Sequence, residues 1–431
     1  MSKSLVPEAP VSAAEVEPHR PTDWRSSAME RRIRRRYAAE RRFRLLGLGA
    51  VVMSAGFLAF LLIVMIAQGH LGFVETRVAV PLDLRQARLG LSAERLRGPG
   101  ADLALSGAGL ERAVDTAANR AYPTQGGAAL LSDGAWLRVR DRLKRDPHLL
   151  AQPFTIDLPV ASAIDVAAKG NGAPAAERVV AALGPRLSRG MAWDFFTGAD
   201  STDATRAGIW GALKGSLLTM LVTLALAFPV GVLSAIYLEE YAPRNRATDF
   251  LEVSINNLAA VPSIVFGLLG LAVFLGTLHL PRSAPLVGGL TLALMTMPVI
   301  VIASRNAIRA VPPSIRDAAL AVGASPIQVV SHHVLPLAAP GILTGTIIGM
   351  ARALGETAPL LMIGMRAFIA APPDRLTDPA TALPVQIFLW SDQVSRGFVE
   401  KTSAAILVLL VFLLAMNGVA IFLRNRFETR W

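Results

Sequence analysis

Long apolar segments without charge constrain this chain more than any other feature. Residues 45–67 contain no Asp, Glu, Lys or Arg over 23 residues, and a helix of that length, about 35 Å, crosses the hydrocarbon core of a bilayer. Only 17% of the chain is charged and 53% is hydrophobic, whereas soluble domains carry about 25% charged residues. We therefore expect an integral membrane protein whose first transmembrane helix is residues 45–67.

Five more apolar segments follow in the second half of the chain and bring the expected number of transmembrane helices to six. They comprise residues 215–238, 253–281, 283–304, 337–365 and 402–423. Four of these five segments carry no formal charge, and the fourth of them contains Arg352 and Glu356. The expected fold class is an all-α polytopic membrane protein with an inserted soluble domain of mixed structure.

The placement of arginine predicts the orientation of these helices. The net charge is +11, and a dense basic stretch, residues 25–44, precedes the first span. Further arginines follow the second, fourth and sixth spans: Arg244 and Arg246, then Arg305, Arg309 and Arg316, then Arg424, Arg426 and Arg430. Because cytoplasmic loops carry an excess of Lys and Arg, we expect both termini in the cytoplasm. The basic stretch, directly before a span, is expected to contact anionic membrane lipid rather than nucleic acid.

Residues 68–208 contain no long apolar segment, and charges, Pro and Gly are scattered through them. We expect an extracytoplasmic domain here, with amphipathic helices near residues 89–96 and 136–143 and a strand near 154–160. Residues 1–44 are expected to form a disordered and basic cytoplasmic segment, and residues 209–431 the membrane core. The chain has no Cys and only six His, in no metal-ligand spacing, so we predict neither a metal site nor a catalytic site.

The segment after the fourth span, residues 310–336, has the signals of two short helices. Pro312 and Pro313 can start a helix, and Gly323 suits a left-handed cap at its end. Pro326 lies near the first turn of a second helix, which Pro336 is expected to end. We therefore predict a helix–turn–helix elbow on the cytoplasmic face, and its small residues would let another surface approach closely.

Residues in this elbow resemble a known motif. Asp317-Ala318-Ala319, Gly323 and Leu335-Pro336 resemble the EAA loop of ABC importer permeases, with Asp where Glu is usual. Residues 209–431 as a whole resemble the PstA-type permease of the phosphate-specific ABC importer, and the N-terminal region resembles the longer variant of that family. The segments that carry this resemblance are residues 258–267, 351–360, 383–387 and 416–426. The resemblance implies a six-helix ABC permease fold and an elbow that docks an ATPase.

The resemblance also implies a function and a set of partners. The chain would be a pathway-forming subunit of an ATP-driven phosphate importer in the bacterial inner membrane, and not itself an enzyme. Its partners would be a second permease of similar fold, an ATPase dimer and an extracytoplasmic phosphate-binding protein. Residues 211–216 do not have the spacing of a P-loop, so we expect ATP and Mg on the ATPase and no cofactor in this chain.

Arg352 and Glu356 are the main candidates for the substrate pathway. They are four residues apart within an apolar span, so a helix would place them on one face, and charges inside the membrane normally face a pathway or a partner. The guanidinium fork of arginine matches phosphate oxygens, and Glu356 could neutralise Arg352 when no anion is bound. The alternative is a buried ion pair that only fixes helix packing.

Ser263 is the remaining pathway candidate. It follows Pro262 in a third span that Pro and Asn residues interrupt, and such interruptions occur where backbone groups line a cavity. Close helix packing by small residues is the alternative reading of this region.

Two other functions remain open at this point. The chain could be a permease for another tetrahedral oxyanion, such as molybdate or sulfate. It could also be a membrane sensor whose 68–208 domain senses a signal and whose elbow docks a cytoplasmic partner. The intramembrane Arg352–Glu356 pair favours transport over sensing.

Overall fold

The computed structural model describes residues 27–87, 89–92, 94–98 and 100–427. The chain divides into two compact units, residues 1–63 and 64–431. Helix α1 (Ser27–Gly69) makes up the described part of the first unit and continues into the second. Of the segment predicted to be disordered, residues 1–44, the first 26 lie outside the described residues.

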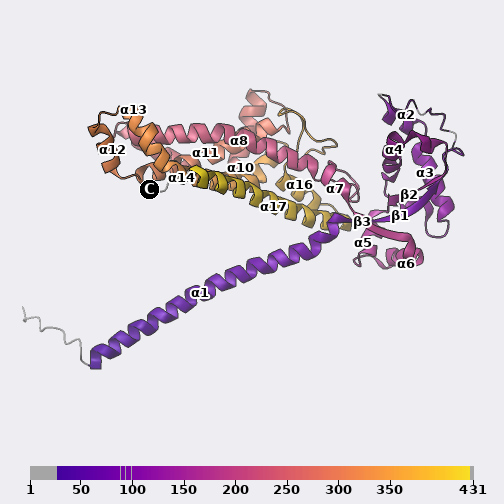
Figure 1. Ribbon diagram of the computed structural model, residues 1–431, viewed down its shortest axis with the longest axis horizontal. Helices are drawn as coiled ribbons and strands as arrows, with labels where there is room; N and C mark the ends of the chain where they lie inside the picture. The colour runs from indigo at the N-terminus through magenta and orange to yellow at the C-terminus, as the bar shows by residue number, and fades with distance from the viewer. Residues whose placement is uncertain (1–26, 88, 93, 99, 428–431) are drawn as a thin grey trace, which may run out of the picture. The chain divides into compact units, whose positions relative to one another are not determined.

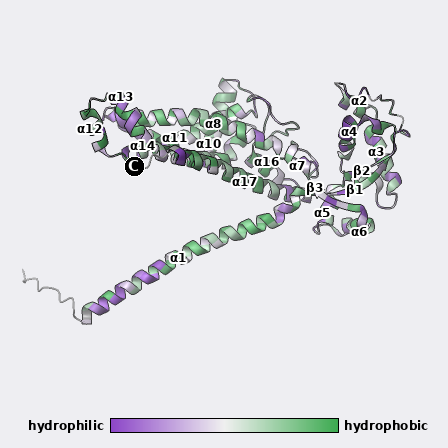
Figure 2. Ribbon diagram, viewed as in Figure 1, coloured by the Kyte–Doolittle hydropathy of each residue, from purple (hydrophilic) through white to green (hydrophobic). Residues whose placement is uncertain are grey.

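Helix α1 is longer than the first predicted span because it begins within the basic stretch. Its residues change from hydrophilic to hydrophobic along its length (Figure 2). Arg, Ala and Glu are strong helix formers, and Glu30 pairs with Arg34 one turn later at 3.5 Å. The described part of the basic stretch is therefore helical, where we had expected a disordered segment up to residue 44.

The membrane core follows the inserted domain and consists of helices (Figure 1). These are α8 (Trp210–Ile236), α9 (Arg246–Ala259), α10 (Ser263–Gly270), α11 (Pro285–Arg309), α12 (Pro313–Ala321), α13 (Pro326–Gln328), α14 (Leu335–Gly355), α15 (Ala358–Met362), α16 (Leu383–Ser391) and α17 (Arg396–Phe427). Three π-helical turns extend α8, α10 and α13: η5 (Tyr237–Tyr241), η6 (Leu271–Thr277) and η7 (Val329–Val334).

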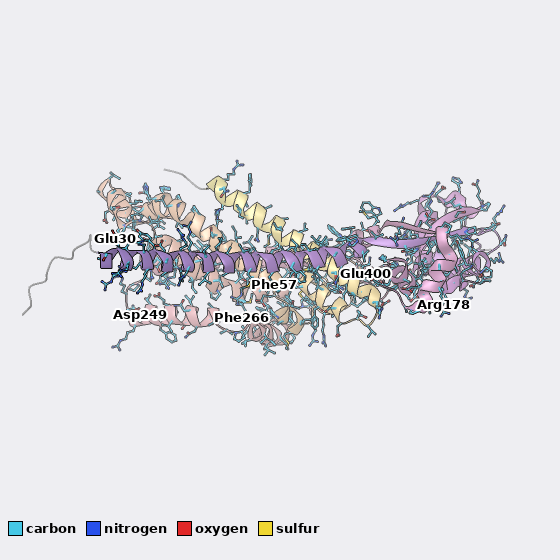
Figure 3. The ribbon with its side chains drawn as sticks, turned by 90° about the horizontal axis from the view of Figure 1, so that it is seen from below. Glu30, Phe57, Arg178, Asp249, Phe266 and Glu400 are labelled. Carbon is cyan, nitrogen blue, oxygen red and sulfur yellow. The ribbon has the colours of Figure 1, made fainter. Side chains whose placement is uncertain are left out.

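Five helices of the described chain are long and apolar enough to cross a membrane, and a sixth crossing results if one bent pair counts as a single span. The five are Met29–Phe73, Trp210–Tyr241, Pro285–Arg309, Pro326–Gly355 and Arg396–Arg426. The bent pair, Arg246–Ala259 with Ser263–Thr277, turns by 100°; Asp249 and Phe266 mark its two halves in Figure 3. Pro262 caps the second half in an extended conformation, so the predicted third span is broken where the sequence places its proline.

Close contacts at glycine hold the centre of the core together. A Cβ on Gly289 of α11 would lie 2.4 Å from the Cβ of Val222 on α8, and a Cβ on Gly345 of α14 would lie 2.1 Å from that of Ala303 on α11. Small residues therefore let α8, α11 and α14 approach more closely than larger side chains would allow.

The inserted domain lies between α1 and α8 and contains a small antiparallel sheet of order β2-β1-β3. Its strands are β1 (Val74–Leu82), β2 (Phe154–Pro159) and β3 (Leu187–Met191). Its helices are α2 (Ala101–Gly107), α3 (Leu110–Ala121), α4 (Ala135–Arg145), α5 (Ser162–Ala168), α6 (Pro174–Leu183) and α7 (Trp193–Thr197). Fully buried Val78 and Val80 of the sheet pack with Val114 of α3 and Val139 of α4, so the domain has a hydrophobic core of its own.

Two of the three local predictions for this domain are confirmed. Strand β2 covers the predicted strand, and α4 covers the predicted helix at 136–143. The helix predicted near 89–96 is wrong, because Gly90 has a left-handed backbone with φ +63° and residues 94–97 form a turn. Glycine adopts that conformation without a steric penalty, and a helix cannot continue through it.

Buried charges join the inserted domain to the start of α17. Lys169 Nζ, just after α5, lies 2.7 Å from Asp165 Oδ2 and 3.0 Å from Glu400 Oε2 of α17, and all three side chains are only 2–9% exposed. Lys401 donates to the backbone oxygen of Gly72 at 2.9 Å. Asp165, Lys169, Glu400 and Lys401 are called the domain junction below; Glu400 is labelled in Figure 3.

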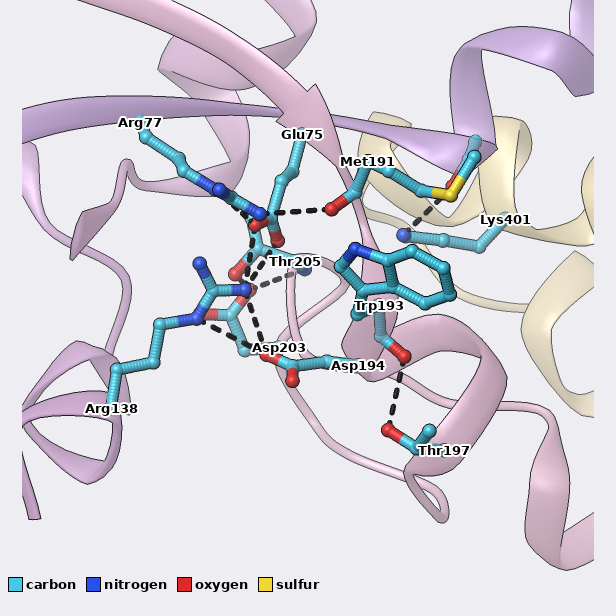
Figure 4. A network of polar contacts seen from close by, with 11 residues as sticks. Glu75, Arg77, Arg138, Met191, Trp193, Asp194, Thr197, Asp203, Thr205 and Lys401 are labelled. Atoms are coloured by element: carbon cyan, nitrogen blue, oxygen red, sulfur yellow. Dashed lines mark hydrogen bonds and ion pairs between the residues drawn. The ribbon is translucent and has the colours of Figure 1, made fainter. Parts of the chain in front are cut away.

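A second set of ion pairs continues inside the inserted domain next to Lys401 (Figure 4). Glu75 of β1 is buried and forms ion pairs with both Arg77 and Arg138. Arg138 also lies 2.9 Å from Asp194 of α7. Burial opposes the charge of Arg138, but the carboxylates of Glu75 and Asp194 raise its pKa above the usual range. Arg138 therefore stays charged and links β1 to α4 and α7.

Candidate functional site

The predicted elbow is present and forms the end of the membrane core away from the inserted domain (Figure 1). Helix α12 begins at Pro313 with Pro312 as its N-cap. Gly323 has φ +89°, the left-handed conformation expected of a C-terminal cap. Ser325 and Gln328 then form a capping box at the start of α13, in which each side chain accepts a hydrogen bond from the other's backbone N–H.

Pro336 does not end the second helix, contrary to the prediction. The helical path continues from Pro326 to Gly355 as one membrane-spanning element, and Pro336 is the second residue of α14. The π-helical turn η7 lies directly before it. This wider turn accommodates the missing N–H and the ring of Pro336, which would otherwise break the α-helical pattern.

The exposed tip of the elbow is apolar. Leu320, Val322 and Ile327 are exposed at 50%, 85% and 68%, and none of the three was a predicted coupling residue. The sequence did contain a signal for them, because they are large apolar residues at a predicted left-handed turn between two membrane spans. An exposed apolar patch beside polar residues is typical of a protein docking surface.

The six predicted coupling residues occupy different positions around this tip. Asp317, Ala318 and Gly323 are exposed, as a docking role requires. Ala319 is buried and packs with Val311, Val329 and Val334, so it supports the elbow from inside. Of the last two, Leu335 is half-buried and Pro336 is exposed at the start of α14, beyond η7.

A cluster of ion pairs lies beneath the elbow. Arg305 contacts Glu239 and also Glu252 of α9, the latter at 2.8 Å. Arg309 contacts Glu239 at 2.9 Å, and Arg316 of α12 contacts Glu240 at 2.8 Å. These six residues are called the elbow cluster: Glu239, Glu240, Glu252, Arg305, Arg309 and Arg316.

Sequence reasoning used the three arginines of this cluster only as signs of orientation. The glutamates were missed, since Glu239 and Glu240 are 66 and 76 residues from their partners Arg305 and Arg316. The available signal was charge complementarity: two glutamates follow the second predicted span, and arginines follow the fourth span on the same side of the membrane.

Arg352 and Glu356 do meet, but not in the predicted way. Helix α14 ends at Gly355, and Glu356 has an extended backbone with φ −79° and ψ 120°, so the two residues do not share a helix face. Their side chains lie 3.6 Å apart, Nε to Oε1, and are 50% and 20% exposed. The pair is therefore loose and only partly buried, and among the described residues no ion pair other than that with Glu356 involves Arg352.

Ser263 lies apart from this pair in its contacts. It is the first residue of α10, directly after the break at Pro262, and it makes no hydrogen bond to Arg352 or Glu356 among the described side chains. The two breaks are nevertheless neighbours, because Gly267 of α10 packs against Pro359 of α15, where a Cβ would lie 2.7 Å from the Pro359 Cα. The third and fifth predicted spans are thus both interrupted in one region of the core.

Comparisons with known proteins match two parts of the chain separately. The family described as binding-protein-dependent transport system inner membrane component matches residues 212–431. A domain of unknown function, DUF3333, matches residues 30–178. The first match ends within α6 of the inserted domain and the second begins within the first turn of α8, so residues 179–211 lie between the two matches.

Among curated relatives, a probable ABC transporter permease protein, YqgI of Bacillus subtilis, is 36% identical over 40% of this chain and 58% of its own length. The phosphate transport system permease protein PstA of Mycobacterium leprae is 35% identical over 49% of this chain and 70% of its own length. A solved structure of the methionine ABC transporter MetNI aligns with a TM-score of 0.40 and 16% identity, over 52% of this chain and 95% of that one.

Proposed function

Because the chain belongs to the family of binding-protein-dependent transport system inner membrane components, we propose that it is the permease subunit of an ATP-driven importer of inorganic phosphate. The observation that carries the proposal is the elbow, whose left-handed turn presents an exposed apolar tip. The substrate is proposed from the curated relatives named as phosphate transport permeases. In this role ATP hydrolysis belongs to a separate ATPase, which holds ATP and Mg.

The apolar tip of the elbow suits the surface of a cytoplasmic ATPase. Leu320, Val322 and Ile327 would be buried in the contact, and burial of apolar area is the main favourable term in association. Asp317 and Ala318 are exposed next to this tip and would flank it. We therefore place the elbow on the cytoplasmic side and the inserted domain outside, which also puts both termini in the cytoplasm.

Arg352 is the proposed phosphate contact in the pathway. With the carboxylate of Glu356 at 3.6 Å, the pair is loose, so a phosphate oxygen could replace Glu356 without breaking a short hydrogen bond. Arginine remains charged and can bind two oxygens at once. A second permease of similar fold would supply the opposite wall of the pathway, and an extracytoplasmic phosphate-binding protein would deliver the anion.

The test is phosphate uptake by a strain from which this chain is deleted. Labelled phosphate should enter only when the intact chain is returned, and excess unlabelled molybdate or sulfate should not compete. Competition by either anion would instead identify another tetrahedral oxyanion as the substrate. Normal uptake in the deletion strain, with a changed transcriptional response, would favour a sensor and reject the proposal.

A further inference from the structure

The side chain of Arg316 joins three parts of the membrane core at the base of the elbow. Its Nη2 and Nε donate to Glu240 Oε1 at 2.8 and 3.2 Å. Its Nη1 donates to the backbone oxygen of Val311 at 2.7 Å, and Nη2 also donates to that of Ile308 at 3.0 Å. One guanidinium on α12 therefore holds the end of α8 and the last turn of α11.

The acceptors of Arg316 suit a cation. The carbonyl of Ile308 lies in the last turn of α11 and that of Val311 two residues beyond its end, where the helix dipole is negative and favours a cation. Glu240 is a carboxylate, and its side chain is only 12% exposed. With both kinds of acceptor around it, Arg316 is held in one position, which a lysine with its single point charge could not reproduce.

Glu240 lies in η5, and this π-helical turn directs two neighbouring glutamates to different partners. Glu239 faces Arg305 and Arg309 of α11, whereas its neighbour Glu240 faces Arg316 of α12. Arg305 is 8% exposed and also binds Glu252 of α9, so this half of the elbow cluster fixes α8 to α9 and α11. The Arg316–Glu240 half is its link to the elbow, and π-helical turns often occur at such functional points.

The position of Arg316 connects this link to the proposed docking surface. It directly precedes Asp317 and Ala318, which are exposed on α12. A displacement of α12 by a bound protein would reach α8 through Arg316 and Glu240, and α8 in turn packs against α11 through Gly289 and Val222.

We propose that Arg316 and Glu240 are positioning residues that transmit movement of the docked ATPase from α12 to α8. The inference rests on the proposed function, since it requires an ATPase at the elbow and transport through the core. It predicts that loss of the pair separates ATP hydrolysis from transport, instead of reducing both together.

The experiment uses the complete transporter in proteoliposomes, with labelled phosphate uptake and ATP hydrolysis measured in the same preparation. In Arg316→Gln and Glu240→Gln, ATP hydrolysis should persist, and phosphate moved per ATP hydrolysed should fall at least roughly tenfold, the order expected from losing charge-assisted hydrogen bonds. The double variant should be no worse than Arg316→Gln, because both changes remove one interaction. Arg316→Lys should lie between these variants and the unaltered protein.

Arg309→Gln is the matched control, because Arg309 belongs to the same cluster but is 58% exposed and has no ion pair to α12. It should leave the transport ratio unchanged. If Arg316→Gln fails to assemble, Glu240→Cys with Arg316→Cys provides a second test in this cysteine-free chain. A flexible bifunctional thiol reagent joining the two cysteines should restore the ratio that the unlinked pair has lost.

An unchanged ratio in both single glutamine variants, or a cross-linked pair that remains uncoupled, would overturn the transmission role. Failure of the proposed function is recognised separately. In that case the unaltered transporter itself would show no ATP-dependent phosphate uptake.

Discussion

The domain junction and the elbow cluster are built from the same kinds of charged side chain, but they differ in exposure. The Lys169, Asp165 and Glu400 side chains are 2–9% exposed, whereas those of Arg305, Arg309 and their partner Glu239 range from 8% to 58%. Removing one partner of a buried pair leaves an uncompensated charge, which is strongly destabilising. Pairs near the surface lose little when they separate, because water replaces the partner.

The backbone contacts sharpen this difference. At the domain junction, Asp165 Oδ1 also accepts the backbone N–H of Thr76 of β1 at 2.7 Å, and glycine packing brings the chain close to α17, since a Cβ on Gly72 would lie 2.5 Å from the backbone oxygen of Glu400. We conclude that the domain junction is a rigid joint. In the elbow cluster the Arg305–Glu239 pair is also buried, at 8% and 10% exposed, whereas Arg309 and Arg316 are 58% and 22% exposed. The Arg316–Glu240 pair can therefore adjust its geometry more easily than the domain junction, as a moving link requires.

The largest effect is expected for Lys169→Met, which tests the rigid joint. Removal of the ammonium leaves Asp165 and Glu400 as two buried carboxylates side by side, and should lower the free energy of unfolding by about 3–5 kcal/mol. The measurement is thermal or denaturant unfolding of the purified protein. Lys144→Met is the matched control, because Lys144 pairs with exposed Asp102, and it should cost less than about 1 kcal/mol. Equal losses in the two variants would mean that burial of the domain junction does not make its ion pairs costly to break, and would contradict the rigid joint.

The next largest effect is expected for Arg352→Gln, which tests the loose Arg352–Glu356 pair, 3.6 Å apart. Loss of charge-assisted hydrogen bonds to phosphate is worth about 1.5–3 kcal/mol, so uptake per assembled complex should fall by roughly 10- to 150-fold. Arg352→Lys should recover part of it. Adding Glu356→Gln should not help, because Glu356 contacts Arg352 only loosely, at 3.6 Å, and loses no short hydrogen bond in the first change. Recovery of uptake in that double variant would show that Arg352 only balances Glu356.

Gly323→Val tests the turn of the elbow with a smaller expected effect. A β-branched residue at φ +89° carries a backbone penalty of about 1–3 kcal/mol, and relief of that strain should displace the apolar tip. Co-purification of the ATPase should fall, whereas Gly323→Asn should preserve it, since Asn tolerates the left-handed region. Gly418→Val is a control at a site that also has open space around it. Normal ATPase recovery and uptake with Gly323→Val would argue against docking at this turn.

The smallest effect is expected from locking the rigid joint with a disulfide. The hydroxyls of Ser162 on α5 and Ser395 before α17 lie 3.4 Å apart, so Ser162→Cys with Ser395→Cys places two thiols side by side in a chain without other cysteines. Oxidation should leave phosphate uptake unchanged, because these segments already move together. Inhibition that a reductant reverses would mean that the inserted domain shifts against α17 during transport.

Local signals in the sequence predicted much of this fold. Apolar segments located the spans, the proline pair started α12, and Gly323 adopted the predicted left-handed turn. Gly355, the last residue of α14, could have warned that Glu356 leaves the helix, because glycine is a poor helix former. Pro336 led to the opposite error: it was expected to end a helix, but the helical path continues through it because a π-helical turn lies directly before it.

Contacts between distant residues could not be predicted in the same way. Lys169 and Glu400 are 231 residues apart, and nothing in either local sequence marks the other as a partner. The exposed tip of the elbow was within reach, because Leu320, Val322 and Ile327 are large apolar residues in a predicted turn. The pairing of Glu240 with Arg316 required the fold, which brings the end of α8 against α12.

The most direct test of the central claim, that the elbow docks an ATPase and the inserted domain lies on the other side of the membrane, is site-directed cross-linking in whole cells. Val322→Cys at the elbow and Leu103→Cys on the inserted domain are matched, since the native side chains are 85% and 79% exposed and the chain has no cysteine of its own. A membrane-permeant thiol-to-amine reagent should join Val322→Cys to the ATPase, and an impermeant thiol label should modify only Leu103→Cys. An ATPase adduct at Leu103→Cys, or labelling of Val322→Cys from outside, would contradict this arrangement.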